Sequence, residues 1–271
     1  MRLVNRRPTP KGGLLLGAVP LLVLAVLYVV AAAARHAENP ADKILPTFGM
    51  MVQAMGTLLA QPDPLSGRLI FWADTFASLQ RLGLGLGIAS LTALLLGLAL
   101  GVLPLLRASL GPVVTTVAVV PPVALLPVLF IVFGLGETAK VALIVIGVAP
   151  FMVRDLALHV SAIPAEQMLK AQTLGASSWQ LALRLALPMA MPRLIASLRL
   201  SLGPAWVYLI AAEAVASDIG LGYRIFLVRR YLSMDIILPY VAWISLLAIA
   251  CDLALLWLSR WAFPWAHGAK R

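Results

Sequence analysis

The stretch LGLGLGIASLTALLLGLALGVLPLL, residues 82–106, contains no Asp, Glu, Lys or Arg. A helix needs about 20 predominantly apolar residues to cross a hydrocarbon core of roughly 30 Å. Backbone amides in hydrocarbon must be bonded internally, so a membrane span is a helix or part of a closed barrel. This run is continuously apolar rather than alternating, which excludes a barrel strand. Residues 14–34 and 108–136 form two more uncharged runs.

The composition of the whole chain agrees with these runs. Of its 271 residues, 62% are hydrophobic and 12% charged, and the mean hydropathy is +0.97. A soluble domain of this size cannot bury so much apolar surface. We therefore predict an all-α polytopic membrane protein with about six spans, near residues 14–34, 82–106, 112–133, 139–157, 190–212 and 236–258.

The third predicted span is rich in proline. Pro112, Pro121, Pro122 and Pro127 would break an isolated helix. Membrane helices tolerate proline where neighbouring helices satisfy the freed backbone groups. We expect a kinked helix packed inside the bundle. An outer loop over residues 36–80 is expected to carry a short interfacial helix near 47–60.

The basic residues predict the orientation of the chain. With the N-terminus inside, twelve Lys and Arg lie on the cytoplasmic side and eight on the outer side. Both termini are then cytoplasmic, and the first span is expected to be uncleaved. The net charge of +10 is explained by this bias and by attraction to anionic lipid. Nucleic-acid binding is not indicated, because the basic residues are scattered along a membrane chain.

Residues 165–188, AEQMLKAQTLGASSWQLALRLALP, form a polar segment between the fourth and fifth predicted spans. A helix is expected to reach Leu174 and to stop at Gly175, because glycine adopts the left-handed conformation that ends a helix. Ser177 or Ser178 can cap the next helix, and Pro188 marks the start of the fifth span. The product is a projecting helix–Gly–helix elbow that can insert into a groove on another protein. The alternative is an ordinary connecting loop.

The elbow resembles the EAA loop of bacterial ABC-importer permeases. Ala171, Gly175, Leu185, Leu187 and Pro188 occupy matching positions, while Leu169 and Lys170 stand where the family has Glu and its first Ala. An ordered set of further motifs is similar to the nitrate/sulfonate/taurine branch: GASSWQ at 175–180, LPxAxP at 187–192, SLGxAW at 201–206, AAE at 211–213 and GLGY at 220–223. The resemblance covers residues 75 to 258.

The resemblance implies a type I ABC-importer permease fold, with residues 158–189 as a cytoplasmic coupling loop inside a transmembrane domain of residues 75–258. Residues 1–74 would form a cytoplasmic tail, the first span and an outer loop, and residues 259–271 a cytoplasmic tail. It implies that the elbow docks into a cytoplasmic ATPase and transmits its closure to the spans. The residues expected to couple are Ala171, Leu174, Gly175, Ala176, Ser177, Trp179, Arg184, Leu187 and Pro188.

Several positions are candidates for the translocation path or gate: Arg199, Glu213, Gly220, Gly222 and Tyr223. A mid-membrane arginine costs at least about 2.5–3.5 kcal/mol, so it faces a cavity or a partner. Arg199 would either line the route and favour anions, or make an interhelical hydrogen bond. Glu213 would pair with Arg224 or Arg81, or hold the gate, and Asp252 in the sixth span is expected to be paired. The family places Gly220, Gly222 and Tyr223 near the gate.

The sequence lacks the motifs of a catalytic chain. The nearest imitation of a phosphate-binding loop, GLGETAK at 134–140, has no glycine before the lysine and no Ser or Thr after it. The three histidines are far apart, which predicts no metal site. We expect a non-catalytic subunit with no cofactor of its own, because the ATP and Mg would be bound by a partner ATPase.

The partners implied by the resemblance are a cytoplasmic ATP-binding subunit, an extracytoplasmic substrate-binding protein and a second copy of the permease, in a bacterial inner membrane. The branch suggests nitrate, a sulfonate or taurine as solute. Residues 37–46 and 224–231 are similar to a sub-branch found with urea- or guanidine-degrading enzymes, so a solute of that kind stays open. An ion-coupled secondary transporter is the alternative from another class, although no internal repeat is present.

Overall fold

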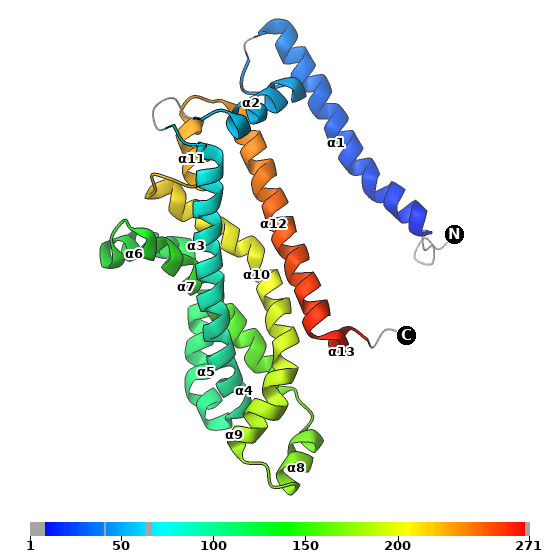
Figure 1. Cartoon of the computed structure of the whole chain (residues 1–271), viewed down its shortest axis with the longest axis vertical. Helices are drawn as coiled ribbons and strands as arrows, with labels where there is room; N and C mark the ends of the chain where they lie inside the picture. Colours follow the sequence, from blue (N-terminus) through cyan, green and yellow to red (C-terminus); the bar gives the residue numbers. More distant parts are fainter. Residues whose placement is uncertain (1–8, 41, 63–66, 269–271) are drawn as a thin grey trace. The chain divides into compact units, whose positions relative to one another are not determined.

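The computed structural model describes residues 9–40, 42–62 and 67–268, and every regular element in that part of the chain is helical (Figure 1). Residues 1–8 and 269–271, the outer parts of the expected tails, lie outside the described residues. The helices are α1 (Pro10–Glu38), α2 (Phe48–Ala60), α3 (Ile70–Thr92), α4 (Leu98–Val102), α5 (Pro104–Val119), α6 (Leu126–Phe133), α7 (Glu137–Ser161), α8 (Ala165–Thr173), α9 (Ser178–Gln180), α10 (Leu187–Val215), α11 (Leu221–Arg229), α12 (Met234–Ala262) and α13 (Pro264–His267).

In the part of the chain that the structure describes, five continuous helical segments are long and apolar enough to span a membrane: Leu15–Glu38, Ile70–Val102, Glu137–Ser161, Ser178–Val215 and Met234–Ala262. Two of them pass through π-helical turns, at Ala93–Gly97 and Leu181–Ala186. The helical pair Pro104–Val119 and Pro122–Phe133 passes the same test as one broken span. The all-α fold with about six spans is therefore confirmed.

The proline-rich third span differs from its prediction. Its two helices meet at an angle of 86°, so the span is broken rather than kinked. The break falls at Val120–Pro122, where two consecutive prolines lack the amides that would continue the helix. The expectation of a helix packed inside the bundle is wrong for α5, which has no buried residue within this chain.

The second span also begins earlier than predicted. Helix α3 starts at Ile70, so it includes Asp74 and Arg81, which an uncharged window excludes. Both side chains are buried and ion-paired. The charges are neutralised inside the protein, which is the condition under which a membrane helix carries them. The predicted outer loop therefore ends before Ile70, and its short helix is present as α2.

The chain divides into two compact units. One comprises Met1–Gln61 and Val228–Pro239, and the other comprises Pro62–Leu227 and Tyr240–Arg271. In the first unit, Tyr28 donates a hydrogen bond of 2.6 Å to the carbonyl of Pro46, and Arg35 pairs with Asp42 at 2.6 Å. The hydrogen bond from the Ile44 amide, together with Arg35, holds the pKa of Asp42 below its usual value.

The second unit is built around α7, which packs against α3, α4, α5, α6 and α10. Close approach to α7 depends on small residues along one face of the second span. A Cβ added at Gly85 would lie 2.7 Å from a side-chain atom of Ile144, and one at Gly101 would lie 2.4 Å from Val160. Ala89 and Ala93 are fully buried between them. Small residues at a spacing of four let membrane helices pack tightly.

Candidate functional site: an exposed elbow and a buried charge cluster

The elbow between α8 and α9 forms as the sequence predicts. Helix α8 ends at Thr173, and Gly175 takes a φ of +83°. The amide of Gly175 donates to the carbonyl of Gln172 at 2.9 Å, and that of Ala176 to the carbonyl of Ala171 at 3.0 Å. These two bonds are the Schellman pattern that ends helices at a left-handed glycine.

The second arm of the elbow starts with a reciprocal cap. The Gln180 amide donates to Ser177 Oγ at 3.3 Å, and the Ser177 amide donates to Gln180 Oε1 at 2.9 Å. Such a capping box satisfies backbone donors at a helix start. Ser177, rather than Ser178, is therefore the cap.

Pro188 does not start the fifth span. The helix runs without interruption from Ser178 to Val215. Since Pro188 lacks the amide that would bond the carbonyl of Arg184, and its ring crowds that carbonyl, the preceding residues widen into the π-helical turn at Leu181–Ala186. The second arm and α10 are thus one continuous helical segment.

The elbow presents apolar side chains to the outside. Leu174 is 88% exposed and Trp179 is 72% exposed, and neither α8 nor α9 contains a buried residue. Figure 1 shows both helices at one end of the larger unit. Ala171, Ala176 and Leu187 are half-buried, while Gly175, Ser177, Arg184 and Pro188 are exposed. Exposed apolar side chains on a rigid projection are typical of a protein interaction surface.

A cluster of charged side chains, which we call the Glu213 cluster, lies between α3, α7, α10 and the start of α11, and all but the exposed Glu137 are buried or half-buried. Its side chains are Asp74, Ser78, Arg81, Glu137, Lys140, Glu213 and Arg224. Glu213 is fully buried. It accepts hydrogen bonds from Ser78 Oγ at 2.8 Å, Arg81 Nη1 at 2.6 Å and the Gly222 amide at 2.8 Å. The prediction of a partner is confirmed for Arg81 but wrong for Arg224.

Arg224 pairs instead with Asp74, at 2.8 Å. Asp74 also accepts from the Gly220 amide at 2.9 Å. Ser78 Oγ accepts from the Leu221 amide at 2.9 Å, and Arg81 Nη1 donates to the carbonyl of Ile219 at 2.8 Å. Side chains of α3 therefore hold the backbone of residues 219–221 in place, and Glu213 of α10 holds Gly222.

The two predicted glycines are required because the turn lies close against α10. Gly220 has a φ of +137°, and a Cβ there would lie 2.5 Å from Cδ of Glu213. A Cβ on Gly222 would lie 2.8 Å from the carbonyl oxygen of Ile210. Tyr223 lies beside this turn, with the Arg224 guanidinium 5.6 Å from its ring centroid.

Sequence reasoning missed Asp74, Ser78 and Glu137 as members of this cluster. For Asp74 and Ser78 the signal was available, because positions 74, 78 and 81 share one face of a helix. Arg81 also pairs with Glu137, which Lys140 contacts at 2.9 Å. The cluster holds three acidic and three basic side chains, so its formal charge balances.

Arg199 and Asp252 form an interhelical pair between α10 and α12. Arg199 Nε and Nη2 each donate to one oxygen of Asp252, at 2.7 and 2.8 Å. The expected pairing of Asp252 is confirmed, and the charge of Arg199 is matched in this chain.

A charge exchange tests this pair. Arg199→Asp or Asp252→Arg alone places two like charges together, and each change is expected to lower the melting temperature of the purified chain by at least about 2–4 °C. The double exchange is expected to recover most of the loss. A double variant that melts as low as the worse single variant would contradict a direct pair.

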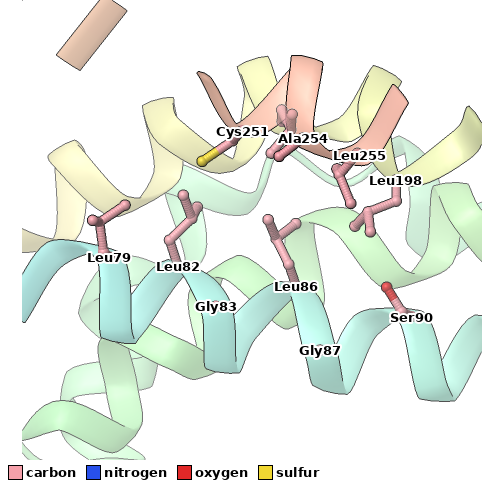
Figure 2. A pocket seen from close by; sticks show the side chains of 11 residues that line it. Leu79, Leu82, Gly83, Leu86, Gly87, Ser90, Leu198, Cys251, Ala254 and Leu255 are labelled. Carbon is pink, nitrogen blue, oxygen red and sulfur yellow. The ribbon is translucent and has the colours of Figure 1, made fainter. Parts of the chain in front are cut away.

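An apolar groove of about 390 Å³ lies between α3, α10 and α12. Figure 2 shows Leu79, Leu82 and Leu86 along one side, facing Cys251, Ala254 and Leu255. Gly83 and Gly87 line this groove, and a Cβ at either would meet nothing within 4 Å. The lining has no charged side chain. Among the described residues, no group of three or more His, Cys, Asp and Glu could hold a metal ion.

Comparison with known proteins shows the family to which the chain belongs. Residues 85–267 match the family described as binding-protein-dependent transport system inner membrane component. The chain belongs to this family. It is therefore a multi-pass permease subunit of an ABC importer and is not itself catalytic, since ATP hydrolysis in such systems is the work of a partner ATPase.

Curated relatives span most of the permease. The taurine transport system permease protein TauC of Escherichia coli is 37% identical over 198 residues, covering 73% of this chain and 71% of its own length. The bicarbonate transport system permease protein CmpB of Synechococcus elongatus is 32% identical, with 71% and 69% covered. The nitrate import permease protein NrtB of the same species is 30% identical, with 69% and 68% covered.

The fold of the permease matches that of a solved transporter. A chain of the inward-facing MetNI methionine ABC transporter superposes with a TM-score of 0.60 at 21% identity, covering 68% of this chain and 92% of that chain. The permease therefore has a type I importer fold, as its sequence motifs imply.

Proposed function

We propose that this permease imports a small oxyanion or sulfonate, and that the elbow at residues 165–188 couples its spans to the ATPase. The relatives named for taurine, bicarbonate and nitrate support the solute class. The observation that carries the coupling role is the rigid elbow with Leu174 and Trp179 exposed at its surface. An ATPase groove that receives the elbow would bury these side chains.

The continuous helix behind the elbow supports transmission of movement. Ser178–Val215 is one helical segment, so a displacement at Trp179 is carried along α10 toward Glu213. Of the remaining coupling residues, Arg184, Leu187 and Pro188 lie on this segment, and Ala171, Gly175, Ala176 and Ser177 shape the elbow before it. At the far end, the turn with Gly220, Gly222 and Tyr223 is held against Glu213 and forms part of the gate.

Arg199 is proposed to act in the path when its pair with Asp252 opens. In the closed pair the side chain of Arg199 is 28% exposed, so it is partly accessible from outside this chain. If a solute anion replaced the carboxylate of Asp252, the positive charge of Arg199 would be compensated before and after the exchange. A neutral or cationic solute such as urea or guanidine would not form an ion pair with Arg199.

The working assembly is proposed to be a permease homodimer with two ATPases and one extracytoplasmic binding protein. The apolar lining of the groove in Figure 2 supports this, because a polar solute needs a different, polar route that two chains can enclose together. The bias of basic residues supports cytoplasmic termini and a cytoplasmic elbow in the bacterial inner membrane, with anionic lipid around it. ATP and Mg would be bound by the partner only.

The test is uptake by proteoliposomes that contain the permease, its ATPase and its binding protein. Labelled taurine, nitrate and bicarbonate are compared with urea and guanidinium. We expect ATP-dependent uptake of an anionic or zwitterionic solute, by an assembly whose mass corresponds to two permease copies. Uptake of urea or guanidinium alone would contradict the solute class, and an active assembly with one permease copy would contradict the dimer.

A further inference from the structure

A second groove, of about 290 Å³, lies between α4, α5 and α7 in the larger unit. It contains two arginines, Arg107 on α5 and Arg154 on α7, together with the hydroxyl-bearing residues Thr115 and Ser161. No acidic residue lines it. Figure 1 shows α4 and α5 toward the same end of this unit as α9, so the groove lies near the elbow.

Arg107 is fixed at the groove by the break before α5. Pro104 has no amide to bond the carbonyl of Leu100. Arg107 replaces it, because its Nε donates to that carbonyl at 2.9 Å and its Nη2 donates to the carbonyl of Gly101. Its Nη1 has no acceptor within the described part of the chain, so one donor nitrogen is left for a ligand.

Arg154 supplies the second charge. It is exposed, and among residues 9–40, 42–62 and 67–268 it has no hydrogen-bond or ion-pair partner. The neighbouring carboxylate, Asp155, is bonded instead to Arg193, with Nε at 2.8 Å. The positive charge at the groove is therefore uncompensated by the protein.

The rest of the lining indicates what kind of anion fits. Leu100, Val114, Ala157 and Leu158 give an apolar wall on membrane helices, and α5 has no buried residue. Guanidinium groups bind phosphate oxygens through paired hydrogen bonds. Basic pockets between membrane helices hold anionic headgroups while apolar walls hold acyl chains. A soluble phosphate would make no contact with the apolar wall, whereas the acyl chain of a lipid would.

We infer that this groove binds an anionic phospholipid, with the phosphate between Arg107 and Arg154 and the start of an acyl chain along Leu100 and Leu158. The inference is independent of the transported solute. Arg107 has a structural role in capping α4, so the variant that tests the site is Arg154→Gln. Arg154→Lys keeps the charge but loses the paired geometry.

The experiment is native mass spectrometry of the purified full-length chain, titrated with phosphatidylglycerol and, separately, phosphatidylcholine. Arg154→Gln is expected to weaken phosphatidylglycerol binding about fivefold, the loss of one basic contact with an anionic headgroup, and to leave phosphatidylcholine binding unchanged. Arg154→Lys is expected to fall between wild type and Arg154→Gln. Arg260→Gln is the matched control, since Arg260 is an exposed arginine near the end of α12.

Three results would overturn the inference. The first is unchanged phosphatidylglycerol binding in Arg154→Gln. The second is an equal loss in Arg260→Gln, because the lipid would then be attracted by surface charge in general. The third is displacement of phosphatidylglycerol by inorganic phosphate at equal concentration, because the site would then be selective for a soluble anion.

Discussion

Replacing Gly175 by proline is expected to abolish ATP-dependent uptake. Gly175 has a φ of +83°, whereas proline fixes φ near −65°. Proline also removes the amide that bonds the carbonyl of Gln172 at 2.9 Å, and it restricts Leu174 before it to extended conformations, whereas Leu174 has a ψ of 6°. Proline at a position whose φ it cannot adopt and whose amide is hydrogen-bonded is destabilising, so the elbow would lose its angle. Uptake is measured in proteoliposomes with the partner ATPase and binding protein.

Gly175→Asn is the control that separates the effect of the backbone conformation at residue 175 from the effect of adding a side chain there. Asparagine tolerates the left-handed conformation better than other side chains, and a Cβ at this position meets nothing within 4 Å. We expect this variant to keep at least about half of the uptake. Co-purification of the ATPase is measured for both variants. Unimpaired uptake in Gly175→Pro would show that residues 165–188 are only a connector.

Replacing Arg81 by methionine is expected to destabilise the permease severely. Arg81 is 4% exposed and pairs with the fully buried Glu213. Removing one partner of a buried ion pair costs about 3–5 kcal/mol, because the other charge stays buried. The melting temperature should fall by at least about 6 °C, measured on detergent-purified protein by gel filtration after heating. Arg68→Met is the control, because Arg68 is exposed just before α3.

Gly220→Ala is expected to disturb the same cluster by a steric clash, without removing a charge. Its Cβ would lie 2.5 Å from Cδ of Glu213, at a φ that favours glycine. We expect a loss of stability comparable to that of Arg81→Met. If Arg81→Met melts like Arg68→Met, the pairing of Arg81 with Glu213 does not support the fold.

The sequence was sufficient for those features that depend on local chemistry. The uncharged runs located the membrane helices, because lipid imposes a length and a composition on each. The end of α8 at Gly175 and the cap at Ser177 were predictable because both depend on residues within one turn of them.

Features that depend on distant partners were not predictable in this way. The start of α3 was placed 12 residues too late, because the charges of Asp74 and Arg81 look incompatible with lipid until their partners are known. Arg81 and Arg224 were equally plausible partners for Glu213, and only the packing of α3 against α10 distinguishes them. The prolines of the third span indicated a kink, but neither the break nor its angle of 86° was predicted.

The sequence separation between paired residues of the Glu213 cluster also constrains how the chain enters the membrane during synthesis. Glu213 follows Arg81 by 132 residues, and Arg224 follows Asp74 by 150. At about 5–20 residues per second, these partners emerge from the ribosome roughly 7–30 seconds after α3. Glu137 follows Arg81 by only 56 residues, so it can neutralise the arginine in the interval. Asp74 has its partners, the Gly220 amide and Arg224, only after α10 and the start of α11 have been synthesised. The hydrogen bonds of α3 are therefore complete only when most of the chain has been made.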